Sequence, residues 1–546
     1  MKKVIPILLA AVMLLTVFAA CGDPPPPPQG AGTTRPADGG QVAQPAPGQI
    51  QAAPEEGANV ASEITLVLDN NNIAVLNMFN PASGTNTTNM AFTMIFDRLL
   101  NTDMQGNFLP GLAYDWSSSD YQTFNFKLRD DVYFHNGEQM TSACVAWTIR
   151  QAQEATGGMA RDQWAPVDRV NVIGPYEIEL VLRSVNVDFY FNVSMPMAGI
   201  VNEKAMRDDP EGGVMIGTGA FMVEEFVSND YTKLRRFDRW WNNSINGGER
   251  EIPTEVVTLI FIPELPVRAI MLENGEAQGC LGPGPEDVSR FQNNPDWEVY
   301  PLTFNNPQNM IFGSLHPITS DYNFRMAILH AIDREEIGIV AAGEWVRADT
   351  QGTLWGLQTQ FRNNDLPIWP YDLDLARQYL EDSVWNGETI EIIAAITTNV
   401  RGAEQFQQQM QVLGVNVVVR EVDPATLAAM TNTPNADLQM GFLNTMVSMN
   451  AGSMRPAFIP GGSQNRGFYD NPEVTELLDR AAVTTDDAAR EALYMEVQRI
   501  FHENPSAFNI YWRIQPYLFA KGMGGMRIFS DHHHNDLRGI FWDLDA

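Results

Sequence analysis

Cysteine is scarce in this chain of 546 residues, which contains only Cys21, Cys144 and Cys280. No two of them form a C-x-x-C pair, so the disulfide framework of a small secreted scaffold is excluded. With 44% hydrophobic and 10% aromatic residues, the chain has enough apolar material for a packed core. We therefore expect Cys144 and Cys280 to be small buried side chains, with a disulfide between them as the alternative.

Positive charge is also scarce. Lys and Arg number 35 against 67 Asp and Glu, which gives a net charge of −32, and no run is rich in Lys or Arg. Proteins that bind nucleic acid or an anionic lipid surface neutralise phosphates with basic side chains. The composition therefore argues against nucleic acid as a partner and against adsorption of the folded body to an anionic membrane.

Catalytic, cofactor and metal motifs are missing too. The chain has no phosphate-binding loop, no G-x-S-x-G, no H-E-x-x-H and no dinucleotide fingerprint, so we predict no cofactor and no catalytic residue. A tight turn is predicted at 217–219, and His135 is expected to make a structural hydrogen bond. We interpret the three consecutive histidines at 532–534 as a solvated turn, because adjacent side chains point in different directions and do not converge on one metal ion. A metal site is the alternative.

Long apolar runs are absent except at the N-terminus. Lys2 and Lys3 precede an apolar run over 4–20 that ends in small residues directly before Cys21. A basic start, a short apolar stretch and a small-residue cleavage site are typical of a signal peptide, and the run is short for a spanning helix. We predict a signal peptide at 1–20.

The residues before Cys21 also resemble a bacterial lipobox, with Phe18 where Leu is usual. In such proteins the Cys becomes the lipid-modified N-terminus after cleavage. The following segment, to about residue 61, is rich in Pro and Gly, with five consecutive prolines over 24–28. It cannot bury enough apolar surface to fold, and its prolines keep it extended. We predict a lipid-anchored linker at 21–61.

Strand and helix patterns alternate in the rest of the chain. Strands are predicted at 64–68, 123–129, 176–182, 220–226, 255–262 and 389–396, and helices after Ser320 or Asp321, after Asn471 and after Asp486 or Asp487. A helix over 404–413, stopped by Gly414, is followed by a strand over 415–419. With the strand at 389–396 it forms a β-α-β unit, which favours a parallel pair. These alternating units predict α/β domains.

Several separated motifs resemble the bacterial extracellular solute-binding proteins of family 5, the oligopeptide-, dipeptide- and nickel-binding receptors of ABC importers. They occur in the family's order at 108–116, 123–129, 132–138, 216–221, 239–241, 272–276, 321–328, 331–334 and 371–373. The resemblance implies a two-lobed, hinge-closing α/β fold of the periplasmic-binding-protein kind. It places the first lobe at 62–300 with an extra subdomain at about 90–200, the second lobe at 301–502, and a return to the first lobe at 503–546.

The expected ligand residues lie after strands, because ligands of open α/β sheets bind beyond the carboxyl ends of strands. Arg401 could pair with a ligand carboxylate at a helix N-terminus; a surface Arg beside Glu404 is the alternative. In peptide receptors of the family, an Asp after a Gly-Trp pair anchors the peptide α-ammonium, and Thr445 stands at that position here. The candidate ligand residues are Asn70, Asn71, Asn72, Arg401, Phe442, Asn444, Thr445 and Met446.

The sequence thus predicts a monomeric lipoprotein on the extracytoplasmic face of the cell membrane. It would capture an oligopeptide or similar small solute and deliver it to an ABC permease and its ATPase. A receptor for a nickel chelate, a sugar or another non-peptide solute is the alternative. A secreted hydrolase with an unrecognised carboxylate pair is a more distant one, because such a pair cannot be singled out in so acidic a chain.

The anchoring prediction is tested by Cys21→Ser. Without the thiol no lipid can be attached, so we expect the variant in the medium or the soluble fraction of the cells. Fractionation and immunoblotting beside the parent chain measure this, and unchanged membrane retention would contradict the lipoprotein assignment.

Overall fold

The structure is a computed structural model that describes residues 49–50, 53–55, 57–68, 73–83, 85–103, 106–283, 285–444, 449–529 and 534–546. Cys21 and the predicted signal peptide lie outside the described residues. Within the described residues, no helix combines the length and apolar character needed to cross a bilayer.

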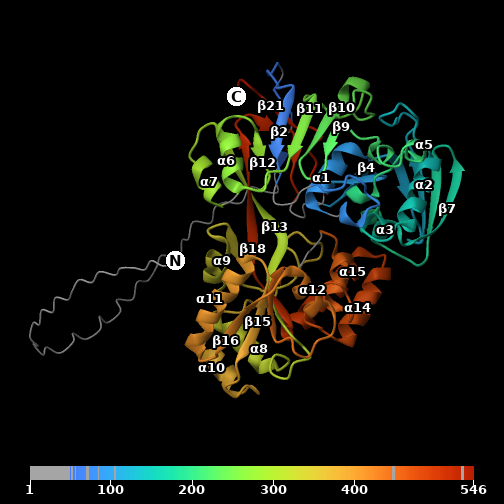
Figure 1. Ribbon diagram of the computed structural model, residues 1–546. Coiled ribbons are helices and arrows are strands. Elements are labelled where there is room, and N and C mark those ends of the chain that lie inside the picture. The colour runs from blue at the N-terminus through green and yellow to red at the C-terminus, as the bar shows by residue number, and fades with distance from the viewer. Residues whose placement is uncertain are drawn as a thin grey trace, which may run out of the picture. The chain divides into compact units, whose positions relative to one another are not determined.

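One large mixed sheet runs through both lobes (Figure 1). Its strands, in spatial order, are β16 (Val417–Glu421), β15 (Ile390–Ala394), β17 (Met440–Asn444), β13 (Trp297–Phe312), β18 (Ala507–Ala520), β12 (Gly279–Cys280), β2 (Glu63–Val67), β11 (Val256–Ile260), β10 (Tyr231–Arg236) and β9 (Phe221–Val227), and β14 (Val346–Ala348) pairs with β18. The long strands β13 and β18 pair antiparallel from Trp297↔Ala520 to Ile311↔Ala507 and belong to both lobes. The positions along β13 and β18 at which one lobe ends and the other begins remain a prediction.

The remaining strands form smaller sheets. A four-stranded sheet has the order β5 (Ala113–Ser117), β6 (Thr123–Leu128), β8 (Glu177–Leu182) and β7 (Val167–Gly174). The two-stranded sheets are β3 (Leu100–Thr102) with β4 (Phe108–Pro110), β19 (Met523–Gly524) with β21 (Phe541–Trp542), and β1 (Gln49–Ile50) with β20 (Met526–Arg527).

The α-helices are α1 (Asn86–Ile95), α2 (Ser142–Glu154), α3 (Met159–Trp164), α4 (Phe189–Asn192), α5 (Glu203–Asp208), α6 (Leu265–Glu273), α7 (Pro285–Phe291), α8 (Tyr322–Ala331), α9 (Arg334–Ala342), α10 (Leu373–Glu381), α11 (Thr397–Leu413), α12 (Pro424–Asn432), α13 (Arg455–Phe458), α14 (Pro472–Val483) and α15 (Asp487–Glu503). Asp321, Asn471 and Asp486 cap α8, α14 and α15, and each accepts a hydrogen bond from a first-turn amide. The predicted helix starts are confirmed, and the structure decides between the neighbouring candidates.

The second lobe has a separate apolar core on each face of its sheet. Met310 and Phe312 of β13 pack in one core with α8 to α11, whereas Ile311 points to the other, which α14 and α15 cover. Strand side chains alternate between faces, so one strand serves both cores. β15 and β16 are parallel and joined by α11, as predicted.

The predicted start of the helix at Glu404 is wrong. α11 begins at Thr397, after Ile396, which has φ 59° and ψ 145° and provides no capping side chain. The chain enters the helix through a conformation that is unfavourable for a β-branched residue, and no N-cap residue marks the start. The predicted end of the helix is confirmed. Gly414 follows the last helical residue and has φ 83°, the left-handed conformation that commonly ends helices and that glycine adopts readily.

In the first lobe, one large core contains side chains of both the large sheet and the four-stranded sheet. In β6, Phe124 and Phe126 are buried and alternate with exposed Asn125 and Lys127, as the sequence predicted. Cys280 is fully buried in β12 and Cys144 is half-buried in α2, and the two do not form a disulfide. The interpretation as a small buried side chain is confirmed for Cys280, whereas Cys144 is only partly buried against the core.

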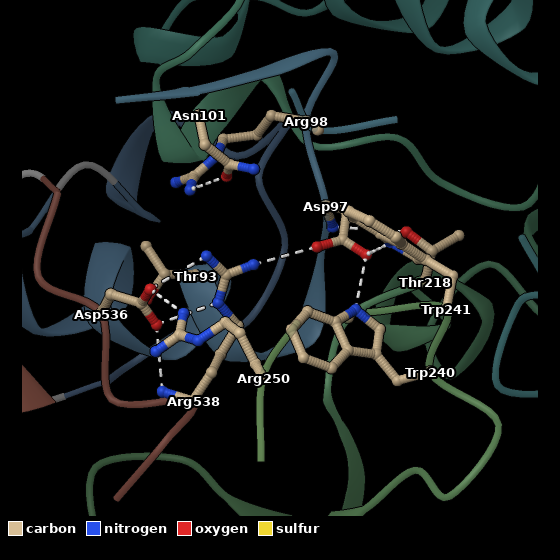
Figure 2. A network of polar contacts seen from close by, with 12 residues as sticks. Thr93, Asp97, Arg98, Asn101, Thr218, Trp240, Trp241, Arg250, Asp536 and Arg538 are labelled. Atoms are coloured by element: carbon tan, nitrogen blue, oxygen red, sulfur yellow. Dashed lines mark hydrogen bonds and ion pairs between the residues drawn. The ribbon is translucent and has the colours of Figure 1, made fainter. Parts of the chain in front are cut away.

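Asp97 ties the C-terminal segment to the first lobe (Figure 2). Its carboxylate accepts hydrogen bonds from the indoles of Trp240 (3.0 Å) and Trp241 (2.8 Å) and from the Arg538 guanidinium (3.1 Å). Arg538 also holds Asp536 through two hydrogen bonds, of 2.9 and 3.0 Å. Burial alone would raise the pKa of Asp536, but Arg250 and Arg538 outweigh it and hold that pKa well below its usual value.

His135 joins two turns of the first lobe, as expected for a structural histidine. Its Nδ1 accepts from the Gly217 amide (3.3 Å), and its Nε2 lies 3.1 Å from the Gly219 carbonyl oxygen, so the proton sits on Nε2. A Cβ on Gly217 would lie 2.0 Å from the Ile95 carbonyl oxygen, which explains the glycine at this turn.

The burial of His135 predicts acid sensitivity. Burial lowers its pKa to about 4, and the unfolded chain has a value near 6.5. The unfolded state therefore binds the proton more readily, and the free energy of unfolding falls by roughly 2 kcal/mol as the pH drops from 6.5 to 4. Denaturant titrations at pH 7 and pH 4.5 should show a smaller loss in His135→Gln than in the parent chain, and equal losses would contradict this assignment.

Candidate functional site

The directions of the strands define a site between the lobes. β17 is antiparallel to the second-lobe half of β13, and β15 is parallel to β17, so both strands run back toward the first lobe. β2 is parallel to β12, which is antiparallel to β18, so β2 points the same way as β13, toward the second lobe. The carboxyl ends of β2, β15 and β17 therefore face one another across the junction of the lobes.

The predicted ligand residues are placed as follows. Asn444 is exposed at the carboxyl end of β17, where its backbone pairs with Gln308 of β13. Phe442 is fully buried in the second-lobe core and packs on Gly402 of α11. Asn70, Asn71, Asn72, Thr445 and Met446 lie outside the described residues.

The sequence predicted that Arg401 lies just before a helix. Arg401 is exposed, but it does not lie there. It lies in the second turn of α11, because the helix starts at Thr397. The residue at the helix start is Ile396, which is 52% exposed at the carboxyl end of β15. Strained backbone of this kind clusters at ligand sites, so Ile396 joins the candidates that the sequence missed.

The two lobes touch at a contact that the sequence did not predict. The Asp188 carboxylate, directly before α4 of the first lobe, accepts a hydrogen bond from Asn450 Nδ2 (2.9 Å) and lies 3.9 Å from Nη1 of Arg490 in α15. A Cβ on Gly452 would lie 2.0 Å from Asp188 Oδ2, so only glycine permits this approach. Nearby, Met449 reaches the turn between β3 and β4, 4.0 Å from a Cβ placed on Gly106.

We call the contact of Asp188 with Asn450 and Arg490 the closure contact, and it depends on a carboxylate that is largely buried. The Asp188 side chain is 20% exposed, and burial raises its pKa, while Asn450 and Arg490 oppose that shift. A carboxylate moved out of water is stable only with partners that replace its hydration, and here both partners come from the other lobe. The contact is therefore favourable only in the closed arrangement.

Of the three consecutive histidines near the C-terminus, only His534 is described, and it does not lie in a solvated turn. His532 and His533 lie outside the described residues, whereas His534 is 4% exposed and packs against the rings of Phe191 and Phe529. The expectation of a solvated turn is wrong for His534, because the C-terminal segment folds back into the first lobe. Within the described part of the chain, no three His, Cys, Asp or Glu side chains converge as metal ligands would.

Two α/β lobes that share a strand pair and present strand ends to a common junction define a hinge-closing ligand-binding protein. The family model for bacterial extracellular solute-binding proteins, family 5 (middle region), matches residues 107–465. The chain belongs to this family.

Known relatives agree with that assignment. The nickel-binding periplasmic protein of Escherichia coli is 23% identical over 78% of this chain and 84% of its own. Di/tripeptide-binding protein 2 of Pseudomonas aeruginosa is 21% identical over 72% of this chain and 79% of its own. The crystal structure of an ABC transporter substrate-binding protein from Listeria monocytogenes superposes with a TM-score of 0.78 at 18% identity, covering 89% of this chain and all of that one.

The closure contact predicts how the lobes respond to mutation. Asp188→Ala removes a contact made only in the closed form, so we expect the closed-to-open ratio to fall about fivefold, roughly 1 kcal/mol. Small-angle X-ray scattering should then report a larger radius of gyration for the unliganded variant. Asp168→Ala, which removes an exposed ion pair with Arg183 in the same lobe, is the matched control and should change nothing. Equal radii for Asp188→Ala and the parent would refute the role of Asp188.

Proposed function

We propose that this solute-binding protein captures a peptide between its lobes and delivers it to an ABC permease and its ATPase. The observation that carries the proposal is the set of strand ends that face one another across a junction already bridged by Asp188 and Asn450. A ligand at the junction contacts both lobes only when they are closed, so binding favours the closed form. The permease can then distinguish loaded from empty protein by its shape.

The described residues at the junction favour a neutral or weakly polar ligand contact. Asn444 offers an amide at the end of β17, and Met449 is an adaptable apolar side chain that packs near the turn between β3 and β4. In the peptide receptors that the sequence resembles, an Asp anchors the ligand ammonium, and Thr445 replaces it here. A hydroxyl cannot form that ion pair, so we propose recognition of the peptide backbone and side chains instead of its free amine.

Transport without catalysis follows from the same arrangement. Closure conceals the ligand and opening releases it, and neither step needs a bond to break. We propose that the protein has no enzymatic activity and acts as a monomer, with one cleft per chain. Lipid at Cys21 and the linker at 21–61 would keep it near the permease on the extracytoplasmic face of the membrane.

A nickel chelate is the competing ligand class, because one relative is named for nickel binding. The two classes are separated by thermal-shift measurements with a peptide library, the N-acetylated library, nickel with histidine, and sugars. A ligand present at 100 times its dissociation constant stabilises the native state by about 2.7 kcal/mol, which raises the melting midpoint measurably.

We expect peptides to raise the midpoint, and N-acetylation to cost less than threefold in affinity, because no carboxylate at position 445 pairs with the amine. A change of Thr445→Asp should restore a preference for free peptides over acetylated ones. A large loss on acetylation in the parent chain would refute the neutral-recognition proposal, and a response to nickel with histidine alone would replace the peptide with a chelate.

A further inference from the structure

A strongly basic cavity lies within the first lobe. It has a volume of about 260 Å³, and five arginines line it, namely Arg98, Arg129, Arg250, Arg527 and Arg538. They lie after α1, after β6, in the loop after Trp241 and in the C-terminal segment, and none of the described residues that line the cavity belongs to the second lobe. The cavity is therefore distinct from the junction between the lobes.

The charge of this cavity contrasts with the charge of the chain. Among the described residues, Glu249 and Asp536 are the carboxylates that line it, against five guanidinium groups, in a protein of net charge −32. A concentration of positive charge in a partly enclosed space attracts anions and excludes cations. Its volume is slightly below the roughly 300–1,000 Å³ of typical small-molecule sites, which suits a small ligand or one group of a larger ligand.

Three of the arginines are paired with a carboxylate, a carbonyl oxygen or an aromatic ring of the protein. Arg538 binds Asp97 and Asp536, and Arg250 also binds Asp536 (Figure 2). The Arg129 guanidinium stacks 4.1 Å from the centre of a Trp241 ring, and its Nε donates to the Gly111 carbonyl oxygen. These contacts hold the cavity wall in place.

Arg98 differs from them. Its Nη2 donates to Asn101 Oδ1 (2.9 Å), but its Nε and Nη1 have no hydrogen-bond partner among the described residues, although the side chain is only 4% exposed. Figure 2 shows it extending away from Asp97, toward the side of the view where Asp536 and Arg250 lie. A buried guanidinium with two unpaired nitrogen atoms is costly unless a further acceptor completes it.

We propose that this cavity is an oxyanion-binding site in which the guanidinium of Arg98 is the principal ligand and Arg527 assists at the rim. The acceptor is a phosphate or carboxylate group, because both present oxygen atoms in the spacing that a guanidinium fork binds. The bound anion bridges α1 to the C-terminal segment that Asp536 and Arg538 hold. Its occupancy does not depend on peptide binding, because every described residue that lines it belongs to the first lobe or the C-terminal segment.

The test uses the purified full-length chain without peptide, titrated with inorganic phosphate or with acetate at constant ionic strength, which chloride maintains. We expect phosphate, acetate or both to raise the melting midpoint and to bind by calorimetry. Arg98→Met should weaken that binding at least tenfold, and Arg527→Gln several-fold. Arg207→Met, on an exposed first-lobe helix, is the matched control and should bind as the parent does.

Comparison of the phosphate and acetate titrations identifies the chemical group that the cavity binds. A response to phosphate alone indicates a phosphate group, and a response to acetate indicates a carboxylate. No response to either anion, or equal binding by the parent, Arg98→Met and Arg527→Gln, would overturn the proposal. If Arg98→Met does not fold, Arg527→Gln decides the outcome. Because no peptide is present, neither result depends on the function proposed for the junction.

Discussion

The antiparallel pair of β13 and β18 is the constraint on which the arrangement of this protein depends. It fixes the directions of the strands on either side, and so makes the carboxyl ends of β2, β15 and β17 face one another. The pairing shifts in register between Thr303 and Pro307, at the middle of β13. Such irregularities bend a strand pair without breaking it, which is what a hinge between two lobes needs.

Charge is distributed in a way that the net value conceals. The surface carries the large negative excess, whereas several arginines are buried in the first lobe around Asp97 and Asp536. Breaking a buried ion pair is far more destabilising than losing an exposed one, so these contacts hold the C-terminal segment against α1.

Much of the fold could be predicted because its signals are local. Alternation in β6, the caps at Asp321 and Asn471, and Gly414 each act within a few residues. The start of α11 could not be predicted, because it follows Ile396 in an unfavourable backbone conformation and no capping side chain marks it. The closure contact could not either, since Asp188 and Asn450 are 262 positions apart and neither belongs to a motif. The rule on strand ends identified an edge of the sheet that faces the junction of the lobes, but not the residues that join them.

The central claim is that ligand binding at the junction closes the two lobes about β13 and β18. Its most direct test is a distance measurement by pulsed electron paramagnetic resonance between spin labels at two exposed sites, Val172→Cys in the first lobe and Val418→Cys in the second. We predict that a saturating peptide converts a broad or longer distance distribution into a shorter, narrower one. Binding confirmed by calorimetry with no change in that distribution would contradict the account.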